Sequence, residues 1–107
     1  MEFQGKMHAE NGVATIRLIG EVDSRSAHRL NELIVAAAGR TPRRLVLLAE
    51  DLTYLSSAGL RSLVFAHQKM GRDVEIVLVG VRPEVAETIR LTGFDRSIVM
   101  QEAVEER

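Results

Sequence analysis

The opening of the chain has the residue pattern of two β-strands. Strand-like residues 3–9 and 13–22 flank Glu10-Asn11-Gly12, and apolar and polar side chains alternate along the second segment. An Asn-Gly pair between two such segments is typical of a tight β-hairpin. The sequence therefore predicts that the chain begins with two antiparallel strands.

Helical periodicity appears first after this hairpin. Asp23 or Ser24 is placed to cap the predicted helix, and Gly39 is placed to end it. The apolar positions of this helix fall on one stripe: Ala27, Leu30, Leu33, Ile34, Ala37 and Ala38. We therefore expect one face of the helix to pack on the sheet.

Two more helices are predicted further along the chain. One runs from about residue 58 to residue 70 and ends at Gly71. The other carries Pro83 in its first turn and stops at Gly93. Proline in the first turn and glycine just past the end are the residues that helices favour at these two positions.

Three apolar segments between and after the helices predict the remaining strands. Residues 45–49 form a continuous apolar run, which we expect to be covered on both faces of the sheet. Residues 74–79 and 98–100 predict two further strands, and residues 102–107 a polar helical end. The predicted order is ββαβαβαβ.

This order predicts an α/β fold made of a single domain spanning residues 1–107. Strands that are joined through helices pair in parallel by right-handed crossovers, whereas the strands of a hairpin are antiparallel. We expect a mixed β-sheet, an opening hairpin and then parallel strands, packed against helices.

Two adjacent hydroxyls lie where the chain passes from the central strand into the second helix. Ser56 and Ser57 are therefore expected at a helix N-terminus. A serine there can accept a hydrogen bond from one of the first helical N–H groups, which is a structural role. The same N–H groups and the helix dipole also tolerate a phosphate on such a serine, which is a regulatory role. The two roles are compatible, and the local pattern leaves both open.

The second helix carries one residue that its apolar pattern does not explain. Its predicted buried face comprises Leu60, Leu63, Val64 and Met70, with His67 in the middle. We expect His67 to be partly buried and hydrogen-bonded. Phe65 and Arg61 point the other way, beside Ser57, as an ordinary exposed pair or as the anchors of an interface.

Composition narrows the possible functions. The chain has 107 residues, 46% of them hydrophobic and 27% charged, which is typical of one globular domain. It has no cysteine, and its three histidines fall in separate elements, so no metal or cofactor site is expected. With a net charge of −1, the sequence does not predict the basic surface that binds nucleic acid. No apolar segment is long enough for membrane insertion, so a cytoplasmic location is expected.

The signatures of an enzyme are scarce. Ser57 does not lie in a G-x-S-x-G motif, and no histidine with a paired carboxylate is placed to activate it. Glu21 and Asp23 form an acidic pair after the second strand, which is typical of a strand end and a helix cap. The ends of the second and third strands can share one edge of the sheet, which would bring Asp23 toward the two serines. We therefore expect a binding protein.

Four segments carry a resemblance to a known family. They are residues 51–61 (DLTYLSSAGLR), 20–23 (GEVD), 82–85 (RPEV) and 91–94 (LTGF). Together they resemble the STAS family, specifically the bacterial anti-sigma factor antagonists. The resemblance implies a non-enzymatic module that, when unphosphorylated, captures an anti-sigma factor and so releases a sigma factor. It also implies that the anti-sigma factor is a serine kinase that phosphorylates the module, and that a PP2C-type phosphatase restores it.

The resemblance implies that Ser57 is the phosphorylated residue, because it lies two positions before Gly59. Many members have aspartate immediately before the acceptor, where this chain has Ser56. Ser56 is therefore an alternative acceptor. The residues expected to contact the partner are Asp23, Ser56, Ser57, Gly59, Arg61 and Phe65.

Two other functions fit the same sequence. STAS-like domains also serve as accessory subunits of membrane transport complexes, in which the serine need not be modified. An enzyme or small-ligand binder that uses the start of the second helix as an anion site is the third possibility.

Overall fold

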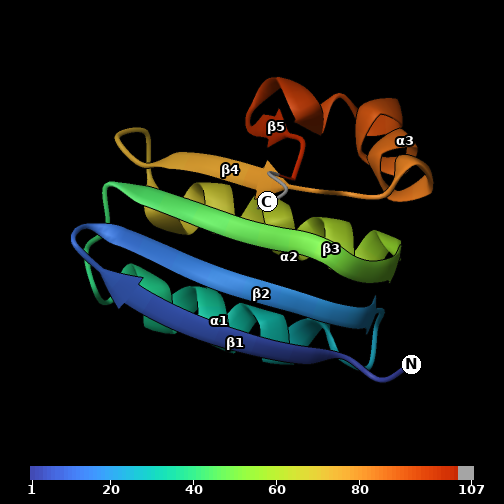
Figure 1. Cartoon of the computed structure of the whole chain (residues 1–107), viewed down its shortest axis with the longest axis horizontal. Helices are drawn as coiled ribbons and strands as arrows, with labels where there is room; N and C mark the ends of the chain where they lie inside the picture. Colours follow the sequence, from blue (N-terminus) through green and yellow to red (C-terminus); the bar gives the residue numbers. More distant parts are fainter. Residues whose placement is uncertain (104–107) are drawn as a thin grey trace, which may run out of the picture.

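Five strands form one mixed sheet, with spatial order β1-β2-β3-β4-β5 (Figure 1). The computed structural model describes residues 1–103. The strands are β1 (Gln4–Glu10), β2 (Val13–Val22), β3 (Arg44–Leu55), β4 (Glu75–Val79) and β5 (Val99–Gln101). β1 and β2 are antiparallel, and every later neighbouring pair is parallel. The predicted α/β class and mixed sheet are confirmed.

The opening hairpin has the turn that its sequence predicts. Glu10 and Val13 are paired, and the two residues between them have positive φ angles, 53° for Asn11 and 79° for Gly12. Two consecutive left-handed residues define the type I′ turn, whose twist matches that of the flanking strands. Asparagine and glycine adopt this backbone more readily than other residues, which is why the turn forms here.

The three crossover helices are α1 (Ala27–Ala38), α2 (Ser57–Met70) and α3 (Pro83–Thr92), and the short 3-10 helix η1 (Phe94–Arg96) follows α3. Pro83 is the first residue of α3, and Gly93 ends that helix in the left-handed conformation, with φ of 80°. The proline at the start of α3 and the glycine at its end are both as predicted. Glu102 and Ala103 are not helical, and the rest of the predicted helical end lies outside the described residues.

The helices lie on one side of the sheet only. In Figure 1 the strands pass in front of α1 and α2, and no helix covers the near face of β2 and β3. On β3, Leu45, Leu47 and Ala49 are buried under the helices, whereas Val46 and Leu48 are only half-buried. The prediction that this strand is covered on both faces is therefore wrong. Successive right-handed crossovers that advance in one direction place their helices on the same face.

β3 continues six residues beyond its predicted end at residue 49. Asp51 does not interrupt it, because the Asp51 carboxylate lies on the uncovered face and accepts a hydrogen bond of 2.8 Å from Arg17 of β2. That bond raises the pKa of the Arg17 guanidinium. The pairing of β2 with β3 shifts register twice along its length and ends with Val22 opposite Leu55.

Candidate functional site

The ends of β2 and β3 lie side by side, which brings together the two segments that the sequence singled out. The N–H of Ser56 donates to the carbonyl of Val22 at 2.9 Å. Asp23 is the next residue after β2, and Ser56 is the next after β3. The predicted meeting of the two strand exits is confirmed, and it places Asp23 and the serine turn at the same edge of the sheet.

The two serines occupy different positions at the start of α2. Ser56 is the N-cap: its backbone is extended, with ψ of 177°, and its Oγ accepts a hydrogen bond from the N–H of Gly59 at 3.3 Å. Ser57 is the first residue of the helix and is exposed. The capping role therefore belongs to Ser56, and the hydroxyl of Ser57 is open to solvent.

Gly59 lets α2 start directly against the ends of the two strands. A Cβ atom at this position would lie 2.6 Å from Cδ1 of Leu55 and 2.9 Å from Cγ1 of Val22. Both distances are shorter than van der Waals contact between carbon atoms. The need for glycine comes from this close approach, and it fixes where the Ser57 turn lies relative to β2 and β3.

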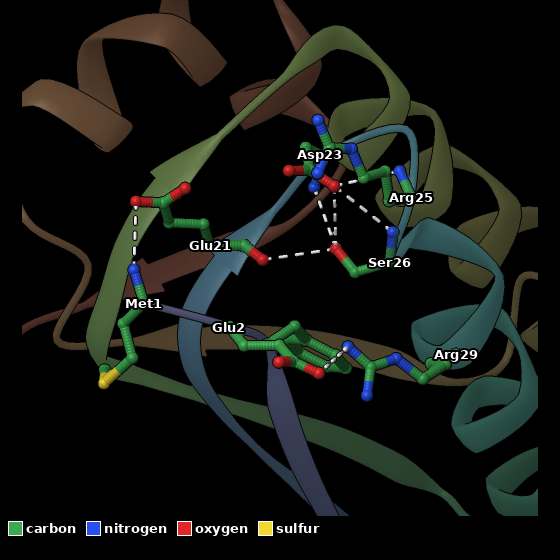
Figure 2. A pocket seen from close by; sticks show the side chains of 8 residues that line it. Met1, Glu2, Glu21, Asp23, Arg25, Ser26 and Arg29 are labelled. Atoms are coloured by element: carbon green, nitrogen blue, oxygen red, sulfur yellow. Dashed lines mark hydrogen bonds and ion pairs between the residues drawn. The ribbon is translucent and has the colours of Figure 1, made fainter.

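Asp23 is held by hydrogen bonds within its own turn (Figure 2). Its Oδ1 accepts from the N–H of Arg25 at 2.9 Å and from the N–H of Ser26 at 3.2 Å. The bond from Arg25 and those from Ser26 hold the pKa of the Asp23 carboxyl below its ordinary value of 3.8. The residue is half-buried.

The predicted capping of α1 by Asp23 or Ser24 is wrong. The N-cap of α1 is Ser26, and α1 begins at Ala27. The Asp23 side chain binds N–H groups that precede the helix, because residues 23–26 first form a separate turn. Asp23 therefore shapes the loop beside the serine turn.

Ser26 is a buried member of this loop that sequence reasoning missed. Its Oγ donates to the carbonyl of Glu21 at 3.2 Å and accepts from the N–H of Asp23 at 3.0 Å. The only feature of the sequence that could have indicated this role is weak: Ser26 is a serine just before an apolar helix. An open pocket of about 510 Å³ adjoins the loop (Figure 2). Its lining residues are Met1, Glu2, Phe3, Glu21, Asp23, Arg25, Ser26 and Arg29.

The buried face of α2 differs from the predicted one. It comprises Gly59, Ser62, Leu63 and Ala66. This face is turned by about a quarter of a helical turn from the predicted stripe, toward small residues. The Ser62 hydroxyl, 1% exposed, reaches the carbonyl of Ala27 at 3.5 Å. Small side chains let α1 and α2 approach closely, which hydrophobic periodicity alone does not reveal.

Because the buried face of α2 differs from the predicted one, the burial of Phe65 and the contacts of His67 differ from prediction as well. Phe65 is half-buried and packs on the core, so the prediction that it is exposed is wrong. It follows Ser62 by three residues, so the two side chains are neighbours on the helix surface. His67 is partly buried, as predicted, but within residues 1–103 its ring meets Phe94 edge-on, at 6.2 Å between centroids, in place of the expected hydrogen bond.

The outward face of α2 is polar and includes the serine hydroxyl. Ser57, Arg61 and Gln68 are all exposed. Arg61 lies one turn after Ser57, so the two side chains are neighbours on the helix surface. The exposed part of the predicted site is therefore Ser57 with Arg61, while Gly59 and Phe65 support it from inside.

Residues 1–103 contain no group of three or more histidine, aspartate and glutamate side chains arranged to hold a metal ion. No helix within that range is long and apolar enough to cross a membrane.

The structure is a one-sided α/β sheet with an exposed serine at the start of its second crossover helix. Comparison with known proteins gives its family. The STAS domain family matches residues 6–107, and the chain belongs to it.

Two curated relatives are similar over most of the chain. The anti-sigma-F factor antagonist RsfB of Mycobacterium tuberculosis is 31% identical over 87 residues, covering 81% of this chain and 71% of RsfB. BtrV of Bordetella bronchiseptica is 36% identical over 85 residues, covering 78% of this chain and 73% of BtrV.

A solved structure agrees with the fold. The crystal structure of an anti-sigma factor antagonist from Mycobacterium paratuberculosis superimposes with a TM-score of 0.85 at 26% identity, covering 94% of this chain and 86% of that one. The family resemblance inferred from the four sequence segments is thereby confirmed.

Proposed function

We propose that this protein is an anti-sigma factor antagonist that acts by binding. In its unmodified form it docks on an anti-sigma factor and thereby releases a sigma factor. The names of RsfB and of the Mycobacterium paratuberculosis protein support this assignment, since both are anti-sigma factor antagonists with similar sequence or fold. The docking surface is the start of α2 with the adjoining Asp23 loop.

The proposal depends chiefly on one observation, the exposure of Ser57 beside a serine that already has a structural role. The Oγ of Ser56 already accepts a hydrogen bond from the N–H of Gly59. Ser57 is free of capping and faces outward with Arg61. Ser57 is therefore the better acceptor for a phosphoryl group, and Ser56 the alternative.

Phosphorylation of Ser57 would act on the complex more than on the fold. A phosphate adds a charge of about −1.5 to −2 at pH 7. At the first position of α2 the helix dipole and nearby N–H groups accommodate that charge. A partner seated over Ser57 has to desolvate the phosphate and accept its charge, so complementarity is lost. The kinase in this scheme is the anti-sigma factor, and a PP2C-type phosphatase reverses the reaction.

Binding measurements test the switch directly. We expect Ser57→Asp to weaken binding to the cognate anti-sigma factor by tenfold or more, and Ser57→Ala to bind like the parent protein. Gln68→Asp is the matched control, since it adds the same charge to the same helix face about 16 Å away. If Ser57→Asp binds as tightly as Gln68→Asp, the switch is wrong.

Mass spectrometry identifies the acceptor. The parent, Ser56→Ala and Ser57→Ala proteins are incubated with candidate anti-sigma kinases and ATP. We expect phosphate on the parent and on Ser56→Ala but not on Ser57→Ala. Phosphate on Ser57→Ala alone would make Ser56 the acceptor.

A further inference from the structure

β1 is a free edge of the sheet. It pairs with β2 on one side only, and in Figure 1 it forms the outer border of the sheet, with no described element beyond it. The strand has seven residues and no proline. A strand of this kind presents unpaired backbone groups that can accept another strand.

The hairpin determines which backbone groups point to the free edge. In a two-residue hairpin the residues next to the turn, here Glu10 and Val13, form a hydrogen-bonded pair, and such pairs alternate along the strands. The N–H and C=O groups of Glu10, His8 and Lys6 therefore point toward β2. Those of Met7 and Ala9 point outward, available to a new partner.

The side chains of β1 have charges that complement a second copy of the same strand. Lys6, His8 and Glu10 are exposed on the uncovered face, where Glu10 contacts His8 at 3.1 Å. If two β1 strands pair antiparallel about His8, Lys6 of each copy lies opposite Glu10 of the other. Opposite charges directly across an antiparallel pair are stabilising.

The neighbouring alignments are poorer. Centring the pair on Met7 sets Lys6 opposite His8, which offers no acidic partner. Centring it on Ala9 shortens the overlap to residues 8–10. Only the alignment about His8 combines two charge pairs with Met7 and Ala9 in the register that exchanges backbone hydrogen bonds. We infer that this protein forms a two-fold dimer through β1, with a continuous ten-stranded sheet.

The layer beneath the strands fits the same arrangement. Met7 and Leu33 are partly buried apolar residues that pack on the core at this edge. Neighbouring strands are about 4.8 Å apart, and α1 lies behind β1 and β2 (Figure 1), so the two copies of α1 would lie roughly 10 Å apart. That is close to the usual distance between packed helices. Met7 and Leu33 would then be covered by their counterparts.

Dimerisation through β1 is independent of the Ser57 switch. Ser57 follows β3, and β2 separates β3 from β1. Neither copy covers the serine turn of the other in an edge-to-edge pair. The dimer would therefore present two Ser57 turns to two partner molecules.

A charge-swap experiment on the full chain tests the inference. Sedimentation velocity over a wide concentration range measures the dimer constant. Lys6→Glu or Glu10→Lys alone turns both attractive pairs into repulsive ones, and we expect each to weaken the dimer by roughly tenfold or more. The double variant Lys6→Glu/Glu10→Lys restores opposite charges in the alignment about His8, so it should recover the dimer.

A backbone variant gives a second readout. Met7→Pro removes an N–H that points to the free edge and leaves the bonds to β2 intact, so the monomer should fold while the dimer is lost. Circular dichroism checks the fold of each variant. A parent protein that stays monomeric up to millimolar concentration would overturn the inference, as would a dimer that the single charge reversals leave unchanged or that the double variant does not restore.

Discussion

At the scale of single residues, the two adjacent serines at the start of α2 have different structural roles. Ser56 makes the capping bond to Gly59, and Ser57 is exposed. We predict that Ser56→Ala lowers the free energy of unfolding by about 0.5–2 kcal/mol, because an orphan N–H loses its acceptor. Ser57→Ala should change it by less than about 0.5 kcal/mol. Urea unfolding of both variants measures the difference, and equal losses would contradict it.

Asp23 gives a prediction about pH. Its carboxyl pKa is lowered in the folded protein, first by the bond from the Arg25 N–H and then by Ser26. The ionised form therefore favours folding: its contribution is present above the ordinary value of 3.8 and is lost as pH falls through the lowered pKa. Asp23→Asn should unfold with a weaker dependence on acidic pH than the parent.

The carboxyl signal of Asp23 in an NMR titration checks the direction of this shift. Asp73→Asn, in the exposed turn after α2, controls for the loss of one negative charge. A titration midpoint of Asp23 at or above 3.8 would show that the loop does not hold the carboxylate as described.

At the scale of elements, the close start of α2 makes its own prediction. Gly59→Ala gains helix propensity of about 1 kcal/mol. However, its Cβ would lie 3.0 Å from the backbone oxygen of Val22 as well as against Leu55. Overpacking of this kind costs about 1–3 kcal/mol, so we expect a net loss of stability and a displaced helix start.

Gly39→Ala is the matched control for that substitution. Gly39 has a helical φ of −64°, and the nearest atom to an added Cβ is 3.4 Å away, which is ordinary contact. Thermal unfolding should show Gly59→Ala melting below the parent and Gly39→Ala at or above it. Similar melting temperatures for the two variants would rule out the steric role of Gly59.

Elements with local signals were predictable from the sequence, and those that depend on distant contacts were not. The Asn11-Gly12 turn, Pro83 and Gly93 set the backbone by their own conformational limits, so the structure has them where expected. The length of β3 depends on its pairing with β2, which continues to Val22 opposite Leu55 and includes the contact of Arg17 with Asp51. The buried face of α2 depends on the approach of α1, so its apolar residues alone gave the wrong rotation.

At the scale of the whole molecule, sequence order predicted the sheet but not how its faces are covered. The ββαβαβαβ order determined which strands are parallel, and the resemblance pointed to the family that the comparisons confirm. The apolar run of β3 suggested two covered faces, yet its half-buried Val46 and Leu48 lie on the open one. Neighbouring strands shield such side chains without any second layer. Ser57 was located correctly at the start of α2 as a presented hydroxyl, while the capping by Ser56 required coordinates.

The ion pairs on the open face have a consequence for how the parallel strands align. Arg17 meets Asp51 across β2 and β3, and Arg44 meets Glu75 at 2.9 Å across β3 and β4. Each pair is exposed and adds little energy by itself. Sliding a strand by two residues would keep its apolar side inward, so burial alone discriminates weakly against that error. Such a slip of β3 would separate both ion pairs, so together they favour the native alignment of this strand over the shifted one.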